Sequence, residues 1–251
     1  MADQSLLDEA DAQYRSGRYG EAVQTYEAAR TLRRDAPYQA FIDLNVAQSL
    51  RRQGHAEEAK LLAQRGLERL ARIKRIATYA ELLVTLANSV ADLGNHVEAL
   101  NTYDRAYQDF QSLGNQYGIY QTLVAKSRSL VALDRSSEAQ TILKIVLDAD
   151  DAPPIVRSQA LNNLAALESE KNPDFARALL QEDLQLHGQL ADDYGLAGTL
   201  INLAIIEIEQ GQIDRAIVLL ESARGAASRV NATDLAVRAT VMLQDLQQER
   251  P

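Results

Sequence analysis

The sequence predicts an all-α fold built as a linear array of helix pairs, and three observations support this prediction. First, an alanine recurs every 37 or 40 residues, at Ala22, Ala59, Ala99, Ala139, Ala176 and Ala216. Second, the apolar residues around each alanine follow the spacing of one face of a helix. Third, residues that tolerate a left-handed conformation separate one helical pattern from the next. A repeat of this length is typical of a solenoid rather than of a globular domain with one central core.

The unit at 78–114 illustrates the pattern. Residues Thr78 to Glu81 have the arrangement of a capping box, which predicts the start of a helix, and apolar residues at helical spacing follow as far as Val90. Gly94 suits the left-handed conformation that ends a helix, and a second helix is expected from Val97 onwards. The other units read in the same way, with helix ends at Gly17, Gly54, Asp134, Asn172 and Gly211.

These units predict six helix pairs, at about 5–36, 38–75, 78–114, 116–150, 154–190 and 193–230, and a polar closing helix at about 233–249. Because the core of a solenoid runs along its axis, we expect residues 1–251 to form a single array. The recurring alanines lie just inside the second helix of each pair, where a small side chain allows the two helices to approach closely. A larger side chain there would overpack the contact, so Ala99→Leu should destabilise the protein more than Ala71→Leu.

Composition limits the classes of partner. The chain has 35 acidic and 26 basic residues, and a net charge of −9 argues against nucleic acid as the main ligand. Residues 30–75 nevertheless contain 11 basic and 5 acidic residues, so Arg65, Arg69, Arg72 and Arg75 form either a basic patch or simply a solvated helix face. No apolar run approaches the about 18 residues that span a bilayer, and the acidic first residues are unlike a signal peptide. We therefore expect a cytoplasmic protein without membrane partners, and the excess of arginine over lysine suggests a bacterial source.

The residues that recur resemble the tetratricopeptide repeat family. The best match lies in the first unit, and the third unit repeats it: Ala10, Gly17, Tyr19, Ala22, Tyr26 and Ala29, then Gly94, Ala99, Tyr103 and Ala106. The 40-residue units resemble the long-helix variety found in kinesin light chains, cell-polarity scaffolds and bacterial signalling proteins. Lys126, at an apolar position of the family, and the lack of tryptophan depart from its pattern. The resemblance implies a right-handed α-solenoid of six helix pairs with a C-terminal capping helix.

No combination of residues indicates catalysis, a metal or a cofactor. The three histidines, His55, His96 and His187, have no second ligand at metal-binding spacing, and we expect them on surface turns. Neither glycine-rich phosphate-binding pattern is present. The lack of cysteine excludes disulfides, thiolate metal sites and a cysteine nucleophile. We therefore expect a protein that is not an enzyme.

The resemblance implies that the first helices line a concave groove that binds a peptide segment of a partner. In this register the polar groove residues are Asn45, Gln48, Arg52, Asn88, Arg128, Asn163 and Asn202. Beside them Val124, Val131, Ile201, Ile205 and Ile208 are expected to form an apolar patch on the C-terminal part of the inner face. An amide offers both a donor and an acceptor, so the asparagines could bond the backbone of an extended peptide, or else bond a neighbouring helix and fix the stacking of the repeats. The apolar patch is either an anchor site or a surface covered by superhelical curvature or by a dimer partner.

Three functions are consistent with these residues. The first is a non-enzymatic adaptor or scaffold that holds a peptide of another protein in its groove. The second is a sensor or regulatory subunit of a bacterial signalling system that is switched by a ligand. The third is a scaffold that assembles with further copies of itself. A chaperone C-terminus is disfavoured as ligand, because only Asn45 matches the clamp that such proteins use.

Overall fold

The computed structural model describes residues 2–73 and 76–248, with side chains from residue 4 onwards. Within these residues it contains thirteen α-helices and no strand. The helices are α1 (Ala2–Arg15), α2 (Tyr19–Ala29), α3 (Ala36–Arg52), α4 (Ala56–Arg69), α5 (Ala77–Asp92), α6 (His96–Leu113), α7 (Gln116–Ala132), α8 (Ser136–Leu147), α9 (Pro154–Glu168), α10 (Pro173–Leu190), α11 (Asp193–Glu209), α12 (Ile213–Arg229) and α13 (Thr233–Gln248). The predicted all-α solenoid of six pairs and a closing helix is confirmed. The predicted ends at residues 75 and 249, and Arg75 itself, lie outside the described residues.

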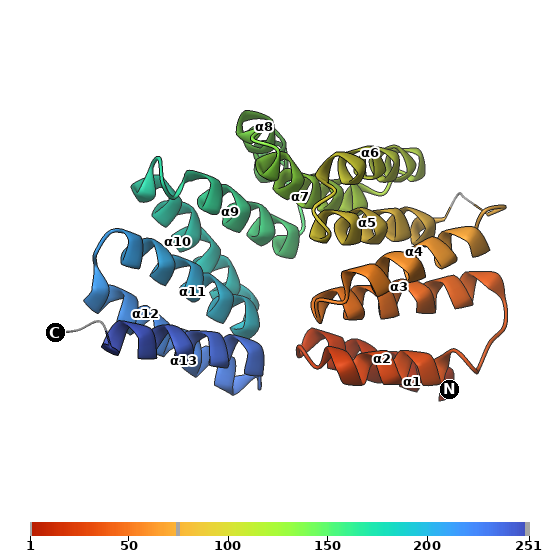
Figure 1. Cartoon of the computed structure of the whole chain (residues 1–251), viewed down its shortest axis with the longest axis horizontal. Helices are drawn as coiled ribbons and strands as arrows, with labels where there is room; N and C mark the ends of the chain where they lie inside the picture. Colours follow the sequence, from red (N-terminus) through yellow and green to blue (C-terminus); the bar gives the residue numbers. More distant parts are fainter. Residues whose placement is uncertain (1, 74–75, 249–251) are drawn as a thin grey trace. The chain divides into compact units, whose positions relative to one another are not determined.

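The chain divides into two compact units, Met1–Pro153 and Pro154–Pro251. In the first unit, α1 to α8 form four helix pairs, and each helix also packs against the next helix along the chain (Figure 1). In the second unit, α9 to α12 form two pairs, and α13 packs against α12 and contacts α11. The division lies between the fourth and fifth pairs, so a single uninterrupted array over residues 1–251 stays a prediction.

The recurring alanines make the close contacts that the sequence predicts. All six are completely buried, and so are their counterparts on first helices such as Ala87 and Ala204. A second close approach joins α6 to α7, where a Cβ atom on Gly118 would lie 2.3 Å from Cδ1 of Phe110. Because interiors are packed at the density of organic crystals, these positions admit no larger side chain without movement.

The backbone conformation of the turns agrees with the prediction at five positions and differs at Asn172. Positive φ angles occur at Gly17, Gly54, Gly94, Gly211 and Asp134, as expected. The left-handed conformation predicted for Asn172 is wrong: its φ is −144°, and its side chain accepts a hydrogen bond from the Phe175 amide and caps the start of α10.

The capping box predicted at Thr78 is also wrong. Ile76, two residues before Thr78, occupies the cap position of α5 without a side-chain hydrogen bond, and the helix begins at Ala77. Isoleucine has no side-chain acceptor for the free amides of the first turn, so the sequence pattern pointed to the polar Thr78 as the cap, two residues too late.

Candidate functional site

The first helices of the first unit lie next to one another and share a polar face. Helix α5 contacts both α3 and α7. Gln48 Nε2 on α3 donates to Thr85 Oγ1 on α5 at 3.4 Å, and Arg51 pairs with Asp92 across the same helices at 3.0 Å. Arg128 Nη2 on α7 then donates to Asn88 Oδ1 on α5 at 3.3 Å. A row of side-chain bonds therefore links three successive helix pairs along this face.

The asparagines of this face bond to the protein itself. Asn45 Nδ2 donates to the backbone oxygen of Phe41 at 2.9 Å. Asn88 Oδ1 accepts a hydrogen bond from the hydroxyl of Tyr103 at 2.7 Å as well as the bond from Arg128. Burial raises the pKa of Tyr103 to about 12, so its hydroxyl remains a donor at neutral pH. These bonds support the structural alternative for Asn45 and Asn88, and peptide binding by the same groups stays a prediction.

The first helix pair uses the same arrangement with a carboxylate. Tyr26 donates to Asp11, and both residues lie 77 positions before the Tyr103 and Asn88 pair. Burial, the hydrogen bond to Asp11 and its negative charge raise the pKa of Tyr26 well above its usual value. The tyrosines of the repeat pattern thus hold first and second helices together and also fix polar groups of the first-helix face.

Of the seven predicted groove residues of the first unit, three are exposed, three are half-buried and one is buried. Arg52 and Arg128 are exposed, and Val131 keeps 40% of its surface exposed. Val124 is only 4% exposed, so its predicted place on an accessible apolar surface is wrong. Val124 lies four positions before Arg128 on the same side of α7, so a shared helix face does not by itself make a side chain accessible.

A half-buried carboxylate lies at the other end of this face. Burial raises the pKa of Glu81 on α5. Tyr117, near the start of α7, is exposed, and its hydroxyl accepts a bond from Gln121 Nε2 at 2.7 Å. Burial and the negative charge of Glu81 raise the pKa of Tyr117. The face therefore carries arginines at one end of its helices and a carboxylate beside a tyrosine at the other.

In the second unit, the first-helix asparagines also connect successive pairs. Asn202 Nδ2 on α11 donates to Asn162 Oδ1 on α9 at 2.7 Å, across a separation of 40 residues. Asn163, the predicted groove residue, is half-buried on α9. As in the first unit, the amide of Asn202 supports stacking, and contact with a ligand stays a prediction.

The predicted apolar patch of the second unit is largely interior. Ile201 is completely buried in a cluster with Ala216 and Leu220 of α12, so the expectation of an exposed Ile201 is wrong. Ile205 and Ile208 are partly buried against the same cluster, which also includes residues of α13. This surface is covered because α12 packs on α11, and α13 packs on α12 and contacts α11.

A buried polar network joins α9, α10 and α11, and the sequence did not predict it. His187 on α10 is 3% exposed rather than on a surface turn, because Gly195 leaves room for its ring: a Cβ there would lie 2.0 Å from Cε1. His187 Nε2 lies 3.0 Å from Ser158 Oγ and 3.5 Å from Asp183 Oδ2, and its Nδ1 lies 3.0 Å from Asp192 Oδ2. The one indication of this pair in the sequence is the spacing of four residues between Asp183 and His187, which puts both side chains on one face of a helix.

The charges of this network favour an ion pair. Burial opposes the charge on His187, but the hydrogen bond and the negative charge of Asp183, together with Asp192, raise its pKa overall. Burial likewise opposes ionisation of Asp183, but hydrogen bonds from His187 and Thr199 lower its pKa. The network stabilises the corner between α10 and α11.

A second buried carboxylate explains two arginines of the predicted basic patch. Asp43 on α3 is completely buried and pairs with Arg30 at 2.8 Å, with Arg65 at 2.5 Å and with Arg69 at 2.8 Å. The sequence left open whether Arg65 and Arg69 form a basic patch or a solvated face. The structure shows instead that both hold α4 to α3 through one aspartate.

A third ion pair borders a cavity of about 540 Å³ between α10, α11 and α12. Glu207 Oε1 accepts a bond from Arg177 Nε at 2.6 Å, while its buried Oε2 has no hydrogen-bond partner among the described residues.

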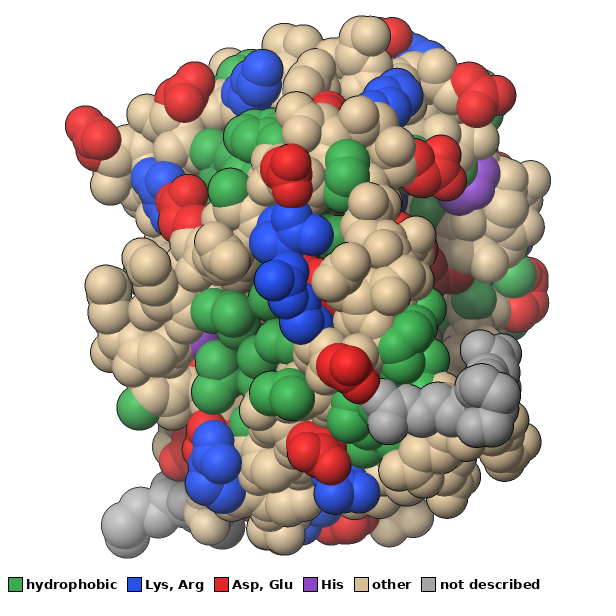
Figure 2. All heavy atoms as spheres, turned by 90° about the vertical axis from the view of Figure 1, so that its left-hand side faces the viewer, with side chains coloured by type: hydrophobic (Ala, Val, Ile, Leu, Met, Phe, Trp, Pro, Cys, Tyr) green, Lys and Arg blue, Asp and Glu red, His purple; other side chains and the backbone are tan. Residues whose placement is uncertain are grey.

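The described residues contain no group of three or more His, Asp or Glu side chains that could hold a metal ion. None of the described helices is long and apolar enough to cross a membrane. On the face that Figure 2 draws, hydrophobic side chains gather in patches beside a group of basic ones.

Comparisons with known proteins agree with this architecture. A family model described as a tetratricopeptide repeat matches residues 4–28. No protein with a curated function matches the chain in sequence.

Among solved structures, a Rap protein complexed with competence and sporulation factor is 14% identical, with a TM-score of 0.72 over 97% of this chain and 74% of its own. The NprR quorum sensor in complex with its cognate peptide NprX is 13% identical, with a TM-score of 0.73 over 100% of this chain and 74% of its own. The putative kinesin light chain repeats of Podosopora anserina are 17% identical, with a TM-score of 0.54 over 74% of this chain and 94% of their own.

Proposed function

We propose that this chain is a tetratricopeptide-repeat protein that acts as a non-enzymatic interaction scaffold, a proposal supported by its fold and by the family match at residues 4–28. Its ligand is a peptide segment of a partner protein, bound along the first-helix face. The observation that carries the proposal is the row of polar bonds from α3 through α5 to α7, flanked by the exposed Arg52, Arg128 and Val131. Asn163 and Asn202 would contribute the same kind of face in the second unit.

The chemistry of this face fits an extended peptide with an acidic segment. Amides such as Gln48 can add bonds to the backbone of a peptide without reading its sequence. The guanidinium groups of Arg52 and Arg128 would pair with carboxylates, and Val131 would contact an apolar side chain. Two structures with the same fold support this ligand class, because each is a complex with a peptide: NprR with its cognate peptide NprX, and a Rap conjugation gene regulator with the Phr* peptide.

A random-peptide library selected on the full chain would test this proposal. Selected peptides should be rich in Asp and Glu, and their affinity, measured by fluorescence anisotropy, should fall at least about tenfold with Arg52→Glu and Val131→Asp combined. The matched control combines Arg105→Glu and Val97→Asp, both exposed on the second helix α6, and should leave the affinity unchanged. Equal affinity for both variants, with unchanged circular dichroism, would remove the first-helix face as the site.

The alternative function is a sensor subunit switched by its ligand, in the cytoplasm of a bacterium. It is favoured by the same likeness to NprR, which is described as a quorum sensor. Ligand binding would then change the pitch of the solenoid, and small-angle scattering with and without a selected peptide would detect the change. Self-assembly into a larger scaffold is separated from both by light scattering at increasing protein concentration.

A further inference from the structure

The cavity of about 540 Å³ in the second unit is formed by three consecutive helices. Helix α11 packs against both α10 and α12, and residues of all three helices line the cavity. Its volume falls within the range of about 300–1,000 Å³ that is typical of sites for small molecules. Neither Asn163 nor Asn202 is among the lining residues, so the cavity does not coincide with the proposed first-helix face.

The cavity contains a carboxylate at a position that is apolar in other helix pairs. Glu207 lies four residues before the turn residue Gly211 and is 3% exposed. The residues at the same distance before the turns of the second, third and fourth pairs are apolar: Leu50, Val90 and Leu130. Because a buried charge costs free energy unless it is paired and hydrogen-bonded, Glu207 needs partners that these apolar residues do not.

The two oxygens of this carboxylate differ in their partners. Oε1 accepts a hydrogen bond from Arg177 Nε at 2.6 Å, and Arg177 also pairs with Asp174. Arg215 Nη1 lies 4.0 Å from Oε2, a distance that balances charge but is too long for a hydrogen bond. Oε2 therefore has no hydrogen-bond partner among the described residues. Since buried polar atoms are rarely left without a partner, Oε2 is the acceptor available to a ligand.

The rest of the lining favours an aromatic ring. Three apolar side chains line the cavity from α11 and α12: Leu203, Val218 and Leu219. The guanidinium group of Arg177 donates to Glu207 through Nε and to Asp174 through Nη1. These bonds lie in the plane of the group, so its two faces remain available for stacking on an aromatic ring.

The charges of the lining disfavour an ionic ligand. Two basic and two acidic residues line the cavity: Arg177, Arg215, Glu207 and Asp214. A cationic ligand would meet both guanidinium groups, and an anionic ligand would meet both carboxylates. Glu207 already has two arginines within 4.0 Å, so it lacks a hydrogen bond rather than a counter-charge. A neutral donor fits this requirement.

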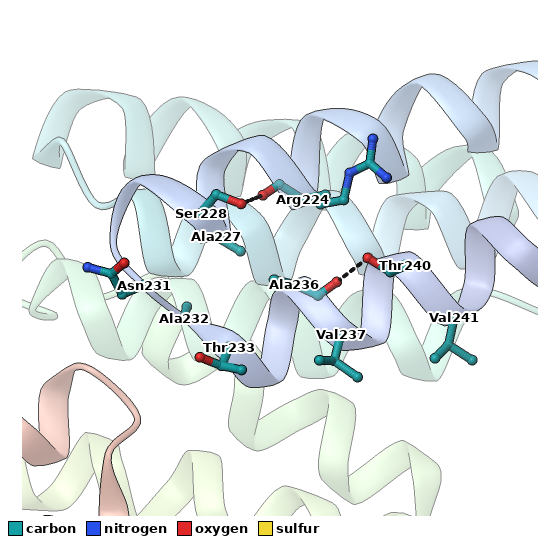
Figure 3. Close-up of a pocket in the computed structure, with 10 residues that line it drawn as sticks. All are labelled: Arg224, Ala227, Ser228, Asn231, Ala232, Thr233, Ala236, Val237, Thr240 and Val241. Carbon is teal, nitrogen blue, oxygen red and sulfur yellow. Dashed lines mark hydrogen bonds between the residues drawn. The ribbon is translucent and has the colours of Figure 1, made fainter.

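A second cavity of the same unit lacks an unused acceptor. It has a volume of about 500 Å³ and lies against α12 and α13 (Figure 3). The hydroxyls of Ser228 and Thr240 each donate to a backbone oxygen of their own helix at 2.8 Å. None of the ten described residues that line it has a buried side-chain oxygen or nitrogen without a partner. Of these two cavities, the one at Glu207 therefore combines an apolar wall with a free hydrogen-bond acceptor.

We propose that the cavity between α10, α11 and α12 binds a neutral aromatic ring that carries one N–H donor, as an indole does. The N–H donates to Glu207 Oε2, and the ring lies between the guanidinium group of Arg177 and the apolar wall. An indole nitrogen only donates, so the ligand brings no acceptor of its own that would remain unsatisfied. Two sources have this chemistry: a free indole compound and the tryptophan side chain of a peptide.

Indole itself is the first probe. This chain contains no tryptophan, so fluorescence excited beyond the absorption of tyrosine reports only the ligand. Titration with the full chain should give a saturable rise in the anisotropy of indole. 1-Methylindole keeps the ring but has no N–H, so it should bind at least about tenfold more weakly.

N-acetyltryptophanamide, which carries the same ring in a peptide-like frame, distinguishes the two sources. Tighter binding than indole would assign the site to a tryptophan of a partner peptide. Weaker binding than indole would assign it to a free indole compound. Both results support the same contact between an N–H group and Glu207.

Substitution of Glu207→Gln separates the hydrogen bond from the shape of the cavity. The amide oxygen keeps the bond from Arg177, and the amide nitrogen then takes the place of Oε2 and cannot accept a hydrogen bond. This variant should bind indole and 1-methylindole equally, with the weaker affinity. Val218→Asp brings a charge to the apolar wall and should weaken both ligands by about threefold or more. Val97→Asp, at a similarly exposed position on α6, should weaken neither.

Three results would overturn the proposal. The first is no saturable binding of indole, which would leave Oε2 to an ordered water molecule. The second is equal affinity of the wild type for indole and 1-methylindole, a comparison that needs no variant to fold. The third is an affinity for indole that Glu207→Gln leaves unchanged. Unchanged circular dichroism of each variant establishes that lost binding is not lost folding.

Discussion

Replacing His187 by glutamine tests how the corner between α10 and α11 is held together. The ring lies among two carboxylates and one hydroxyl: Asp183 on its own helix, Asp192 in the turn, and Ser158 on α9. Thr199 on α11 adds a neutral hydroxyl that bonds Asp183 at 2.6 Å. Glutamine keeps one donor for Asp183 but removes the positive charge, so it isolates the ionic part of the network.

The expected cost follows from the burial of the pair. Removing one partner of a buried ion pair costs about 3–5 kcal/mol, and a retained hydrogen bond returns about 1 kcal/mol. We therefore expect His187→Gln to lower the free energy of opening of this corner by about 2–4 kcal/mol near pH 6.

The pH dependence has a defined sign. The raised pKa of His187 means that its stabilising contribution is complete below the ordinary value of about 6.5 and is lost as pH rises through the higher folded value. The lowered pKa of Asp183 means that its contribution is present above about pH 4 and is lost as pH falls through the lower folded value. The difference between wild type and His187→Gln should thus be largest between about pH 4 and pH 6.5 and should shrink at higher pH.

Hydrogen–deuterium exchange followed by mass spectrometry would measure this difference on peptides from α10 and α11 in the full chain. Wild type and variant are compared at the same pH, about 5.5 and then about 8.5, so that the intrinsic exchange rate cancels. His55→Gln is the matched control, because His55 is exposed and pairs with the exposed Glu58. A difference below about 1 kcal/mol at the lower pH, or one that does not shrink at the higher pH, would refute the ionic account of this corner.

Three further substitutions test the packing of the first unit. Ala99→Leu should destabilise the protein by about 1–3 kcal/mol and Ala71→Leu, at an exposed position, by less than about 0.5 kcal/mol; equal melting temperatures would contradict the helix register. Gly118→Ala should cost about 1–3 kcal/mol because its Cβ meets Phe110, and Phe110→Leu should partly restore the urea midpoint of Gly118→Ala if that contact is the cause. Asp43→Asn should cost about 3–5 kcal/mol, since an amide cannot balance three guanidinium groups, and an unchanged urea midpoint would show that these arginines are neutralised by solvent instead.

The sequence predicted the fold well because the fold depends on a periodic property. Alanine recurs at Ala22, Ala59 and their counterparts, and glycine recurs at the turns. This pattern predicts the helix pairs directly. Accessible positions were harder to predict, since each helical residue is rotated by about 100° from the last. An error of one position therefore moves a side chain from the surface to the core. Val124 shows a second difficulty, because it is buried although it lies four positions before the exposed Arg128 on the same helix face.

The buried polar groups could not be predicted from the repeat. Asp43, His187 and Glu207 occupy unrelated positions of their pairs, and their partners come from two or three different helices. Periodicity identifies which residues share a face of one helix, but it does not say which side chains of adjacent helices meet. The network around His187 required the tertiary structure for this reason.

Binding of a peptide to the first-helix face should be driven mainly by charge and by recognition of the peptide backbone. Polar groups of this face already bond to one another, so a peptide there exchanges hydrogen bonds with water and protein and gains about 0.5–1.5 kcal/mol from each new bond. Little apolar surface is buried in such an exchange, so the heat-capacity change of binding should be small. The affinity should instead depend on Arg52 and Arg128 and should fall as salt is added, because salt screens exposed charges.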